Sequence, residues 1–372
     1  MHICSVITSF TSGGAETLVS KLASQFVKAG HKVSVIALSD ARDVGNSPEF
    51  EQGFITQLRA QGVATRSLSL GWRRPLFAGG KAIKDALRAI DPDVIHLHTA
   101  RAVLMTGLAR PTAPVILTHH NSRLSFPARM FTIFDRIVFA YVGISDACTR
   151  QTRAYARKPA RMILNGADAS FRAAAPRSGL GKTVTLLAVG ALSEQKDYPT
   201  LVAAAERLSD GMLADGRSIR LRIVGGGEMM PELAALVNAN DARAHIELLG
   251  VRSDVPDLMR SADIFVNSSQ YEGLSVAMIE AMMAALPVVA TDVPGNCELV
   301  HHGRNGLLPA AGDPQAFASQ VQDLIRTPGL YGRLSQGALE SSEALTMENC
   351  AASHLQLYEE ATAFKIARKE AA

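Results

Sequence analysis

The stretch IFVNSSQYEGLSVAMIEAM, residues 264–282, places a strand-like segment, a short loop and a helical segment in direct succession. Its first four residues form an apolar run typical of a buried strand, and an apolar segment of helical length begins near Gly273 to Val276. The backbone amides of Gly273, Leu274 and Ser275 would lie free at the start of that helix. Free amides at a helix N-terminus favour an anion, so this stretch suits a diphosphate.

Two glutamates of the same stretch are candidate ligand-binding residues. Glu272 lies in the loop before the helix, and Glu280 lies two turns into a helix that is otherwise apolar. A carboxylate in apolar surroundings is costly unless it is paired or bonded to ligand hydroxyls. A purely structural interpretation makes Glu272 a partner of the helix dipole and Glu280 a member of a buried network. Because both flank a helix start suited to phosphate, we favour the binding interpretation.

Strands and helices alternate through most of the chain. The expected strands of the first half are residues 2–8, 32–38, 94–98, 115–118 and 136–142, with helices at 20–29 and 81–90. The alternation breaks at 169–182 (ASFRAAAPRSGLGK), which suits an interdomain linker, and restarts with strands expected at 183–189, 218–224, 246–249, 264–267 and 287–291. This order predicts an α/β fold of two βαβ modules, whose parallel sheets carry helices on both faces. Ligands should bind at the carboxyl ends of the strands, in the cleft between the modules.

Length and composition agree with this organisation. A chain of 372 residues fits two domains, and 47% hydrophobic with 20% charged residues is typical of a globular protein. The net charge of +3, from 38 basic and 35 acidic residues, is too small to predict nucleic-acid binding, and we expect none. Cys4, Cys148, Cys297 and Cys350 lie far apart without a CxxC pair, which argues against a disulfide framework or a zinc site. With neither a signal peptide nor an uncharged apolar run of about 20 residues, we expect a cytoplasmic protein.

Three further segments run from an expected strand into a loop. Residues 9–16 (SFTSGGAE) and 221–228 (LRIVGGGE) are rich in glycine, which lets a backbone approach a ligand closely. In residues 190–197 (GALSEQKD), Lys196 lies just beyond a strand and can reach a phosphate as a point charge. Tight turns and a solvated lysine stay open as structural interpretations. None of the three has the dinucleotide pattern GxGxxG.

Together these motifs resemble the retaining glycosyltransferases of family GT4, which have the GT-B fold. The two glutamates of EGLSVAMIE, with seven residues between them, resemble the EX7E signature of that family. The segments GGAE (13–16), THH (118–120), ILNGAD (163–168), 190–197 and 223–228 occur with it in the family's order, along nearly the whole chain. The resemblance implies two Rossmann-like domains facing a cleft. They would be an acceptor-side domain at 1–170 and a donor-binding domain at 171–346, with a helix at 347–372 packing back on the first.

The resemblance also implies roles for residues of the donor-binding domain. Glu280 would bind the ribose hydroxyls of a nucleotide-sugar donor, and Glu272 would lie beside the donor sugar. The diphosphate would be bound by Lys196 and by the helix-start amides of residues 273–275. Further donor-binding residues would be Gly14, Gly190, Gly225 and Arg252, the last as an alternative phosphate ligand.

The implied site also includes one histidine, and at one position this chain departs from the family pattern. In the Thr-x-His pattern, His120 would touch the donor sugar near the reacting carbon, whereas strand alternation points His119 the other way. His120, Glu272 and Lys196 would be the catalytic residues. The family often has an arginine where this chain has Ala191, which leaves Lys196 as the one strong cation beside the diphosphate.

The implied function is transfer of a hexose, with retained anomeric configuration, from a UDP- or GDP-linked donor. The acceptor would be a lipid-linked or growing cell-surface glycan, as in polysaccharide or lipopolysaccharide biosynthesis. No DxD-type carboxylate pair lies beside the diphosphate site, so we expect neither a metal nor a cofactor. Two alternatives stay open: a sugar-nucleotide epimerase of the same fold, and a non-catalytic nucleotide-sugar-binding subunit, which Ala191 makes conceivable. The missing GxGxxG argues against a dehydrogenase.

Two segments of the first domain mix aromatic and basic residues, 72–77 (WRRPLF) and 123–134 (RLSFPARMFTIF). Aromatic side chains enter the headgroup boundary of a membrane and arginines attract anionic lipid, which suggests peripheral docking on the inner leaflet beside a lipid-linked acceptor. The alternative, phenylalanines in the core with solvated arginines, stays open. His96 and His98 alternate on one strand face and are interpreted as core or acceptor-side residues.

Overall fold

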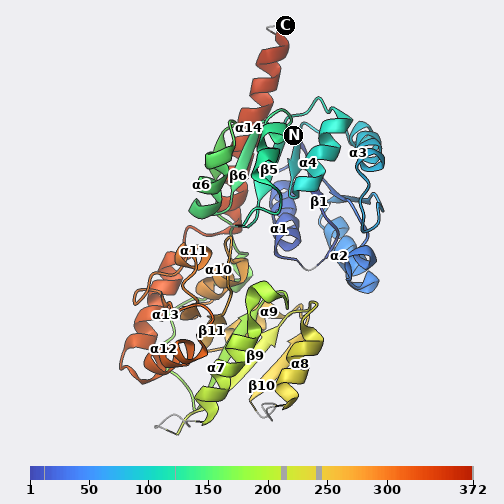
Figure 1. Ribbon diagram of the computed structural model, residues 1–372. Coiled ribbons are helices and arrows are strands. Elements are labelled where there is room, and N and C mark those ends of the chain that lie inside the picture. Colours follow the sequence, from blue (N-terminus) through green and yellow to red (C-terminus); the bar gives the residue numbers. More distant parts are fainter. Residues whose placement is uncertain (12, 122, 211–215, 240–244, 371–372) are drawn as a thin grey trace. The chain divides into compact units, whose positions relative to one another are not determined.

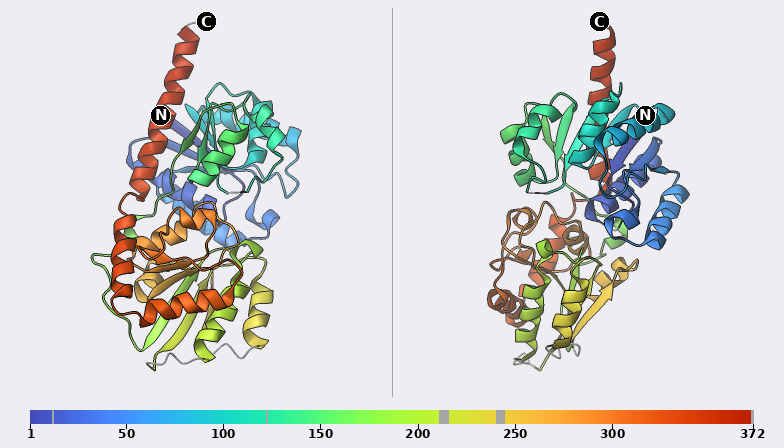
Figure 2. Two further views of the ribbon diagram at one scale, coloured as in Figure 1. Left: turned by 60° about the vertical axis from the view of Figure 1, so that its left-hand side comes forward. Right: turned by 45° about the vertical axis from the view of Figure 1, so that its right-hand side comes forward.

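The computed structural model describes residues 1–11, 13–121, 123–210, 216–239 and 245–370. The chain folds into two compact units: Met1–Asn165 with Met347–Ala372 forms unit 1, and Gly166–Thr346 forms unit 2. Each unit has one parallel sheet with helices packed on it (Figure 1 and Figure 2), which confirms the predicted α/β class.

Unit 1 has a seven-stranded sheet in the order β3-β2-β1-β4-β5-β6-β7. Its strands are β1 His2–Ile7, β2 Lys32–Ala37, β3 Ala64–Ser67, β4 Val94–Leu97, β5 Val115–His119, β6 Ala140–Gly143 and β7 Ala160–Met162. Alternate side chains of β1 pack into two different hydrophobic cores. Ile3 and Ile7 lie in the core that α1 (Gly14–Lys28) and α14 (Met347–Glu370) cover. Cys4 and Val6 lie in the core that α3 (Leu76–Ile90) and α4 (Ala100–Ala109) cover, so the strand is buried on both faces.

The other helices of unit 1 are α2 Pro48–Ala60, α5 Phe131–Phe134 and α6 Asp146–Tyr155. The C-terminal helix α14 packs back on this unit, as the resemblance implied. Tyr358 of α14 has no exposed surface, and its ring centroid lies 5.6 Å from that of Phe26 in α1. Within the part of the chain that the structure describes, no helix combines the length and apolar character that crossing a membrane requires.

Unit 2 has a six-stranded sheet in the order β10-β9-β8-β11-β12-β13. Its strands are β8 Thr183–Val189, β9 Ser218–Val224, β10 Ile246–Gly250, β11 Ile264–Asn267, β12 Val288–Ala290 and β13 Gly306–Leu307. One face is covered by α7 (Tyr198–Asp210), α8 (Met230–Ala239), α12 (Pro314–Arg326) and α13 (Leu330–Ser341). The remaining helices are α9 Val255–Ser261, α10 Val276–Met283 and α11 Pro294–Cys297.

The expected linker at 169–182 is wrong, because this segment belongs to unit 2, which begins at Gly166. Phe171 is buried, and the Arg177 guanidinium donates to the carbonyls of Met259 (2.9 Å), Ala262 (2.5 Å) and Ala284 (3.3 Å). These carbonyls lie at the C-terminal ends of α9 and α10, where a cation is favoured and the backbone acceptors lack helical partners. A composition of Ala, Gly and Pro does not reveal that one arginine fastens the segment to the domain.

Candidate functional site

The start of α10 lies where the sequence predicted it. Ser275 is the N-cap, and its hydroxyl accepts a hydrogen bond from the amide of Met278 at 3.4 Å. Gly273 and Leu274, directly before it, are buried together with Glu272. The N-terminus of α10 is therefore held in place by its own cap, and the preceding loop is part of the packed domain.

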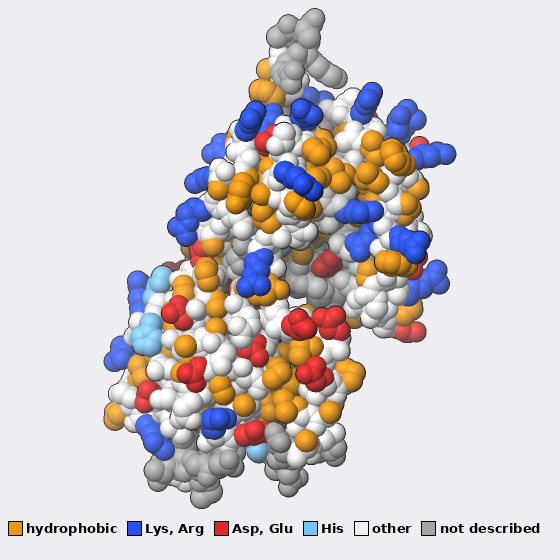
Figure 3. All heavy atoms as spheres, in the orientation of Figure 1, with side chains coloured by type: hydrophobic (Ala, Val, Ile, Leu, Met, Phe, Trp, Pro, Cys, Tyr) orange, Lys and Arg blue, Asp and Glu red, His pale blue; other side chains and the backbone are white. Residues whose placement is uncertain are grey.

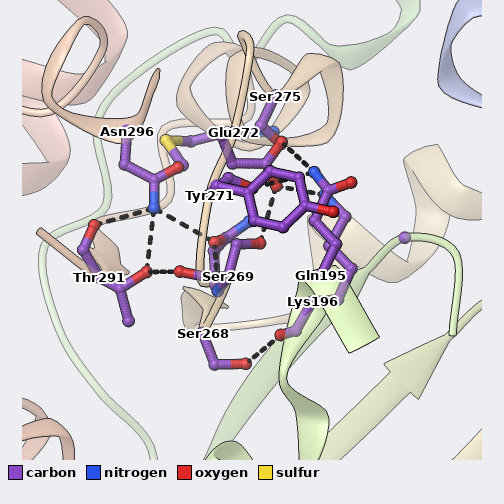
Figure 4. Close-up of polar contacts among 12 residues, drawn as sticks. Gln195, Lys196, Ser268, Ser269, Tyr271, Glu272, Ser275, Thr291 and Asn296 are labelled. Carbon is purple, nitrogen blue, oxygen red and sulfur yellow. Dashed lines mark hydrogen bonds and ion pairs between the residues drawn. The ribbon is translucent and has the colours of Figure 1, made fainter. Parts of the chain in front are cut away.

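Lys196 and Glu272 form a buried ion pair beside this helix start (Figure 4). Their side chains are 17% and 6% exposed. Lys196 ends a 3-10 turn after β8 and Glu272 follows β11; the two strands are neighbours in the sheet, so the loops at their carboxyl ends meet. Charges buried to this degree require a partner, and here each is the partner of the other.

Two more side chains complete the bonding of the Glu272 carboxylate. Ser269 donates its hydroxyl to Oε1 at 2.7 Å, and the Gln195 amide donates to Oε2 at 3.4 Å and to the carbonyl of Tyr271 at 2.9 Å. Figure 4 shows these groups converging on the glutamate from both loops. The carboxylate is thereby held in one orientation.

A second set of contacts fixes the loop that carries Ser269. The Thr291 hydroxyl donates to the carbonyl of Ser269 at 2.5 Å, and the Asn296 amide donates to the carbonyl of Thr291 at 2.9 Å. The Ser268 hydroxyl donates to the backbone carbonyl of Lys196 at 2.8 Å (Figure 4). Sequence reasoning missed Gln195, Ser269, Thr291 and Asn296. Their one signal was position, since all follow the carboxyl ends of parallel strands.

The glycines after β8 and β9 have a structural explanation. A Cβ on Gly225 (φ +149°) would lie 1.8 Å from the carbonyl oxygen of Gly190, and one on Gly227 (φ +158°) would lie 2.4 Å from that of Leu192. The two loops therefore meet backbone against backbone, which only glycine allows. Contact of Gly190 and Gly225 with a donor stays a prediction.

The remaining donor-side residues lie in different surroundings. Glu280 is half-buried within α10. Arg252 is 45% exposed, and its Nε and Nη2 atoms donate to the two carboxylate oxygens of Asp254 at 2.8 and 2.7 Å. Its charge is thus already paired at the surface. Of the predicted donor-side charges, the structure brings Lys196 and Glu272 together.

In unit 1, His120 follows β5 and shares a hydrogen bond with His98, with 3.0 Å between His120 Nε2 and His98 Nδ1. The two rings stack with centroids 5.2 Å apart and planes at 26°. Burial and the neighbouring His119 and His354 lower the pKa of His120 to about 3, so the ring is neutral at physiological pH. His96 is fully buried, which settles its place in the core, whereas His98 is a partner of the predicted catalytic histidine.

His119, which sequence reasoning set aside, faces other neighbours. Its ring lies 6.0 Å from that of Phe126, and burial lowers its pKa to about 4. Among the described residues, neither of its ring nitrogens has a hydrogen-bond partner. An unpaired, largely buried imidazole is costly, so this ring is a second candidate for contact with a bound molecule.

The glycine loop of unit 1 leads into α1. Gly14 is the first residue of the helix, and a Cβ built there would meet no atom within 4 Å. Gly13 lies against the carboxylate of Glu16, whose pKa is raised by burial. Ser12 of the same loop lies outside the described residues. The open space at Gly14 is compatible with the close approach of a ligand.

The two aromatic segments of unit 1 differ in exposure. Trp72 is 67% and Phe77 is 80% exposed. Phe131 and Phe134 are buried in the core that also contains residues of α3 and α4, so the docking hypothesis is wrong for these two rings. Arg123 and Arg129 are exposed.

Two family models match the chain. Residues 12–171 match the model described as Glycosyltransferase Family 4, and residues 183–327 match the one described as Glycosyl transferases group 1. The chain is 36% identical over 164 residues to the putative glycosyltransferase EpsD of Bacillus subtilis. The matched region covers 43% of this chain and 42% of that protein. It is 26% identical over 331 residues to the lipopolysaccharide core biosynthesis glycosyltransferase LpsE of Rhizobium meliloti, covering 81% of this chain and 94% of that protein.

A solved structure shares the fold over almost the entire chain. Anabaena Alr3699/HepE, crystallised in complex with UDP and glucose, superposes with a TM-score of 0.77 at 20% sequence identity. The superposition covers 97% of this chain and 100% of that one. At this identity the likeness establishes the fold and no more.

Proposed function

Because the chain belongs to the family 4 and group 1 glycosyltransferases and has their GT-B fold, we propose that it transfers a sugar from a nucleotide-sugar with retained anomeric configuration. The observation that carries this proposal is the buried pair of Lys196 and Glu272 beside the N-terminus of α10. It provides a cation and helix amides for a diphosphate, and a carboxylate for sugar hydroxyls, in one place. The complex of HepE with UDP supports a UDP-linked donor, and a GDP-linked donor is the alternative.

Each donor-side residue has a chemical task in this proposal. Lys196 and the amides of residues 273–275 bind the diphosphate, whose negative charge grows as it leaves the sugar. Glu272 accepts hydrogen bonds from sugar hydroxyls, and Glu280 accepts them from the ribose. The glycine loops at Gly14, Gly190 and Gly225 allow backbone to approach the donor. Arg252 takes over a phosphate contact only where its pair with Asp254 opens.

The chemical step that we propose has no protein nucleophile. The acceptor hydroxyl attacks the anomeric carbon on the face from which the diphosphate departs, and the departing phosphate oxygen takes the acceptor's proton. His120, a neutral imidazole, stabilises the sugar near the reacting carbon as a hydrogen-bonding group. The proposal includes no metal, because no DxD-type carboxylate pair lies in the sequence beside the diphosphate segment.

NMR of the product's anomeric proton, with and without a chelator, tests the chemical step. We expect the configuration of the donor and undiminished transfer in the chelator. An inverted product, or complete loss of transfer in the chelator, would contradict the mechanism. A protein that binds a nucleotide-sugar but transfers nothing to any acceptor would support the non-catalytic alternative that Ala191 suggested.

For the acceptor, we propose a lipid-linked glycan reached by peripheral docking of unit 1. Support comes from the exposed Trp72 and Phe77, and from Arg101, which donates to the carbonyls of Arg73 (3.1 Å) and Arg74 (2.6 Å) and so holds their loop. Figure 3 shows Lys and Arg side chains spread among hydrophobic ones on the visible face of unit 1. Such a surface suits an anionic bilayer. The likeness to LpsE, a lipopolysaccharide core glycosyltransferase, agrees with this acceptor class.

Co-sedimentation with anionic and neutral vesicles tests the docking. We expect binding to anionic vesicles that is lost when Arg73 and Arg74 are replaced by Glu. Binding that ignores lipid charge would remove the electrostatic part of the proposal, and absence of binding would indicate a soluble acceptor.

A further inference from the structure

A line of ring contacts and hydrogen bonds joins the C-terminal helix to His120 through the interior of unit 1. The Tyr358 hydroxyl of α14 shares a hydrogen bond with His96 Nδ1 at 2.6 Å. The ring of His96 lies 4.0 Å, between centroids, from the ring of His98. His98 in turn shares its 3.0 Å hydrogen bond with His120. On its other side, His96 Nε2 shares a hydrogen bond with the Thr118 hydroxyl at 2.6 Å.

The surroundings of His98 determine where the shared hydrogen lies. Among the described residues, His98 Nε2 is buried and has no hydrogen-bond partner. If His120 donated to His98 Nδ1, a neutral His98 would carry its own hydrogen on Nε2, as a buried N–H without an acceptor. Orphaned buried N–H groups are rarer than unfilled acceptors. The favoured arrangement therefore has His98 donating from Nδ1 to His120 Nε2.

This arrangement also fixes the tautomer of His120. With Nε2 accepting from His98, neutral His120 carries its hydrogen on Nδ1. The ring can then offer a bound molecule an N–H donor, and its basic nitrogen is already occupied. A histidine held in this way suits hydrogen bonding to a sugar oxygen and does not suit abstraction of a proton from the acceptor.

We propose that His98 is a positioning residue that orients His120 and fixes its hydrogen on Nδ1. His96 packs against His98 and is itself hydrogen-bonded to Tyr358 of α14. This positioning role rests on the proposed role of His120 at the donor sugar. The burial of all three histidines agrees with it, since it lowers their pKa values and keeps them neutral. In this proposal α14 covers the sheet of unit 1 and also helps to hold His98 in place.

The matched variants are His98→Asn and His98→Leu. An asparagine amide can place a donor near the position of His98 Nδ1, whereas leucine fills the space without one. We expect His98→Leu to lower kcat by about 10²-fold with a nearly unchanged donor KM, because a misplaced reacting group costs rate more than binding. His98→Asn should recover most of the rate, and a merely structural effect would leave the two variants alike.

The decisive readout does not depend on activity. In the full chain labelled with ¹⁵N-histidine, long-range ¹H–¹⁵N correlation spectra report which ring nitrogen carries the hydrogen, and the His120→Gln variant assigns the signals. We expect Nδ1–H for His120 in the wild type and in His98→Asn, and a shift toward Nε2–H in His98→Leu. An Nε2–H tautomer in the wild type would overturn the proposal, even where the leucine variant fails to fold.

The role of His120 and the positioning role of His98 are tested separately. If the His120→Ala variant transfers sugar at the wild-type rate, sugar transfer stands but His120 has no catalytic role, and the kinetic part of the proposal is wrong. The tautomer of His120 still decides whether His98 positions it. If instead His120→Ala is inactive but His98→Leu is fully active, the proposed function stands and the positioning role is wrong.

Discussion

Lys196 and Glu272 lie on loops after neighbouring strands of unit 2, and each neutralises the charge of the other. In the proposed function, a diphosphate and the Glu272 carboxylate compete for the same ammonium charge. The carboxylate would keep its hydrogen bonds from Ser269 and Gln195 but lose part of its countercharge, which is costly for a buried charge. Hydroxyls of the transferred sugar would donate to the carboxylate and offset this cost, whereas a nucleoside diphosphate lacks that sugar. We therefore expect the pair to favour the intact donor over the nucleotide product.

Replacing Lys196 by Met should lower the transfer rate by roughly 10²-fold or more, because its charge acts on negative charge that develops as the diphosphate leaves. Steady-state kinetics measure this. Lys182→Met, an exposed lysine of the same unit, is the control and should behave as wild type. The double variant with Glu272→Gln removes the unpaired carboxylate and should stay slow. Normal turnover would move the phosphate role to Arg252 or to the backbone amides.

Glu272→Gln should tighten the binding of UDP by about tenfold, because Lys196 no longer has a competing carboxylate. The affinity advantage of a UDP-sugar over UDP should shrink in the same variant. Calorimetric titrations of both ligands into wild type and variant measure the two effects. Unchanged or weaker binding of UDP would show that the ion pair does not compete with the diphosphate.

Stability should fall as the pH falls below about 6.5. Burial lowers the pKa of His119 to about 4 and of His120 to about 3, and also lowers those of His96, His98 and His354. The unfolded chain therefore binds more protons than the folded one between these values and 6.5, so unfolding becomes easier as pH drops, by up to about 1.4 kcal/mol per pH unit for each histidine. Chemical denaturation at pH 7.5, 6 and 5 measures this, and His120→Asn should weaken the dependence. A free energy of unfolding that is flat over this range would contradict the burial of the cluster.

Arg177→Met should destabilise unit 2 by about 3 kcal/mol, because the carbonyls at the ends of α9 and α10 lose a charged donor. Denaturant unfolding of the full chain measures the change. Arg207→Met, an exposed arginine on α7, is the matched control and should shift the free energy of unfolding by less than about 0.5 kcal/mol. Equal effects of the two variants would mean that the segment 169–182 is not fastened by Arg177.

The central strands could be predicted from the sequence because β8 and β11 read as short, largely buried apolar runs and β9 alternates buried apolar residues with more exposed ones. The bounds of β8, β9 and β11 agree with the prediction at both ends. The edge strands β3, β7 and β13 were missed, since Ala64–Ser67 alternates between exposed and half-buried residues and Gly306–Leu307 has two residues only. The strand expected at 136–142 begins later, at Ala140, because the preceding residues continue the turns after α5.

The sequence predicted segments of the candidate site but not the contacts between their side chains. The helix start at Ser275 follows from local pattern, since caps and apolar runs are local signals. The pairing of Lys196 with Glu272 joins residues that are far apart in the sequence, and only the strand order brings them together. The same holds for His98 and His120, which follow the neighbouring strands β4 and β5.

Calorimetric titration of a panel of UDP- and GDP-sugars tests the central claim, that unit 2 binds a nucleotide-sugar donor through the segment around α10. We expect at least one of them to bind the wild type, and to bind Glu280→Ala about tenfold more weakly or worse, because the ribose hydroxyls lose a charged acceptor. Glu343→Ala, an exposed glutamate of unit 2, should bind as the wild type does. Failure of every UDP- and GDP-sugar to bind the wild type, or equal binding by Glu280→Ala, would contradict the account.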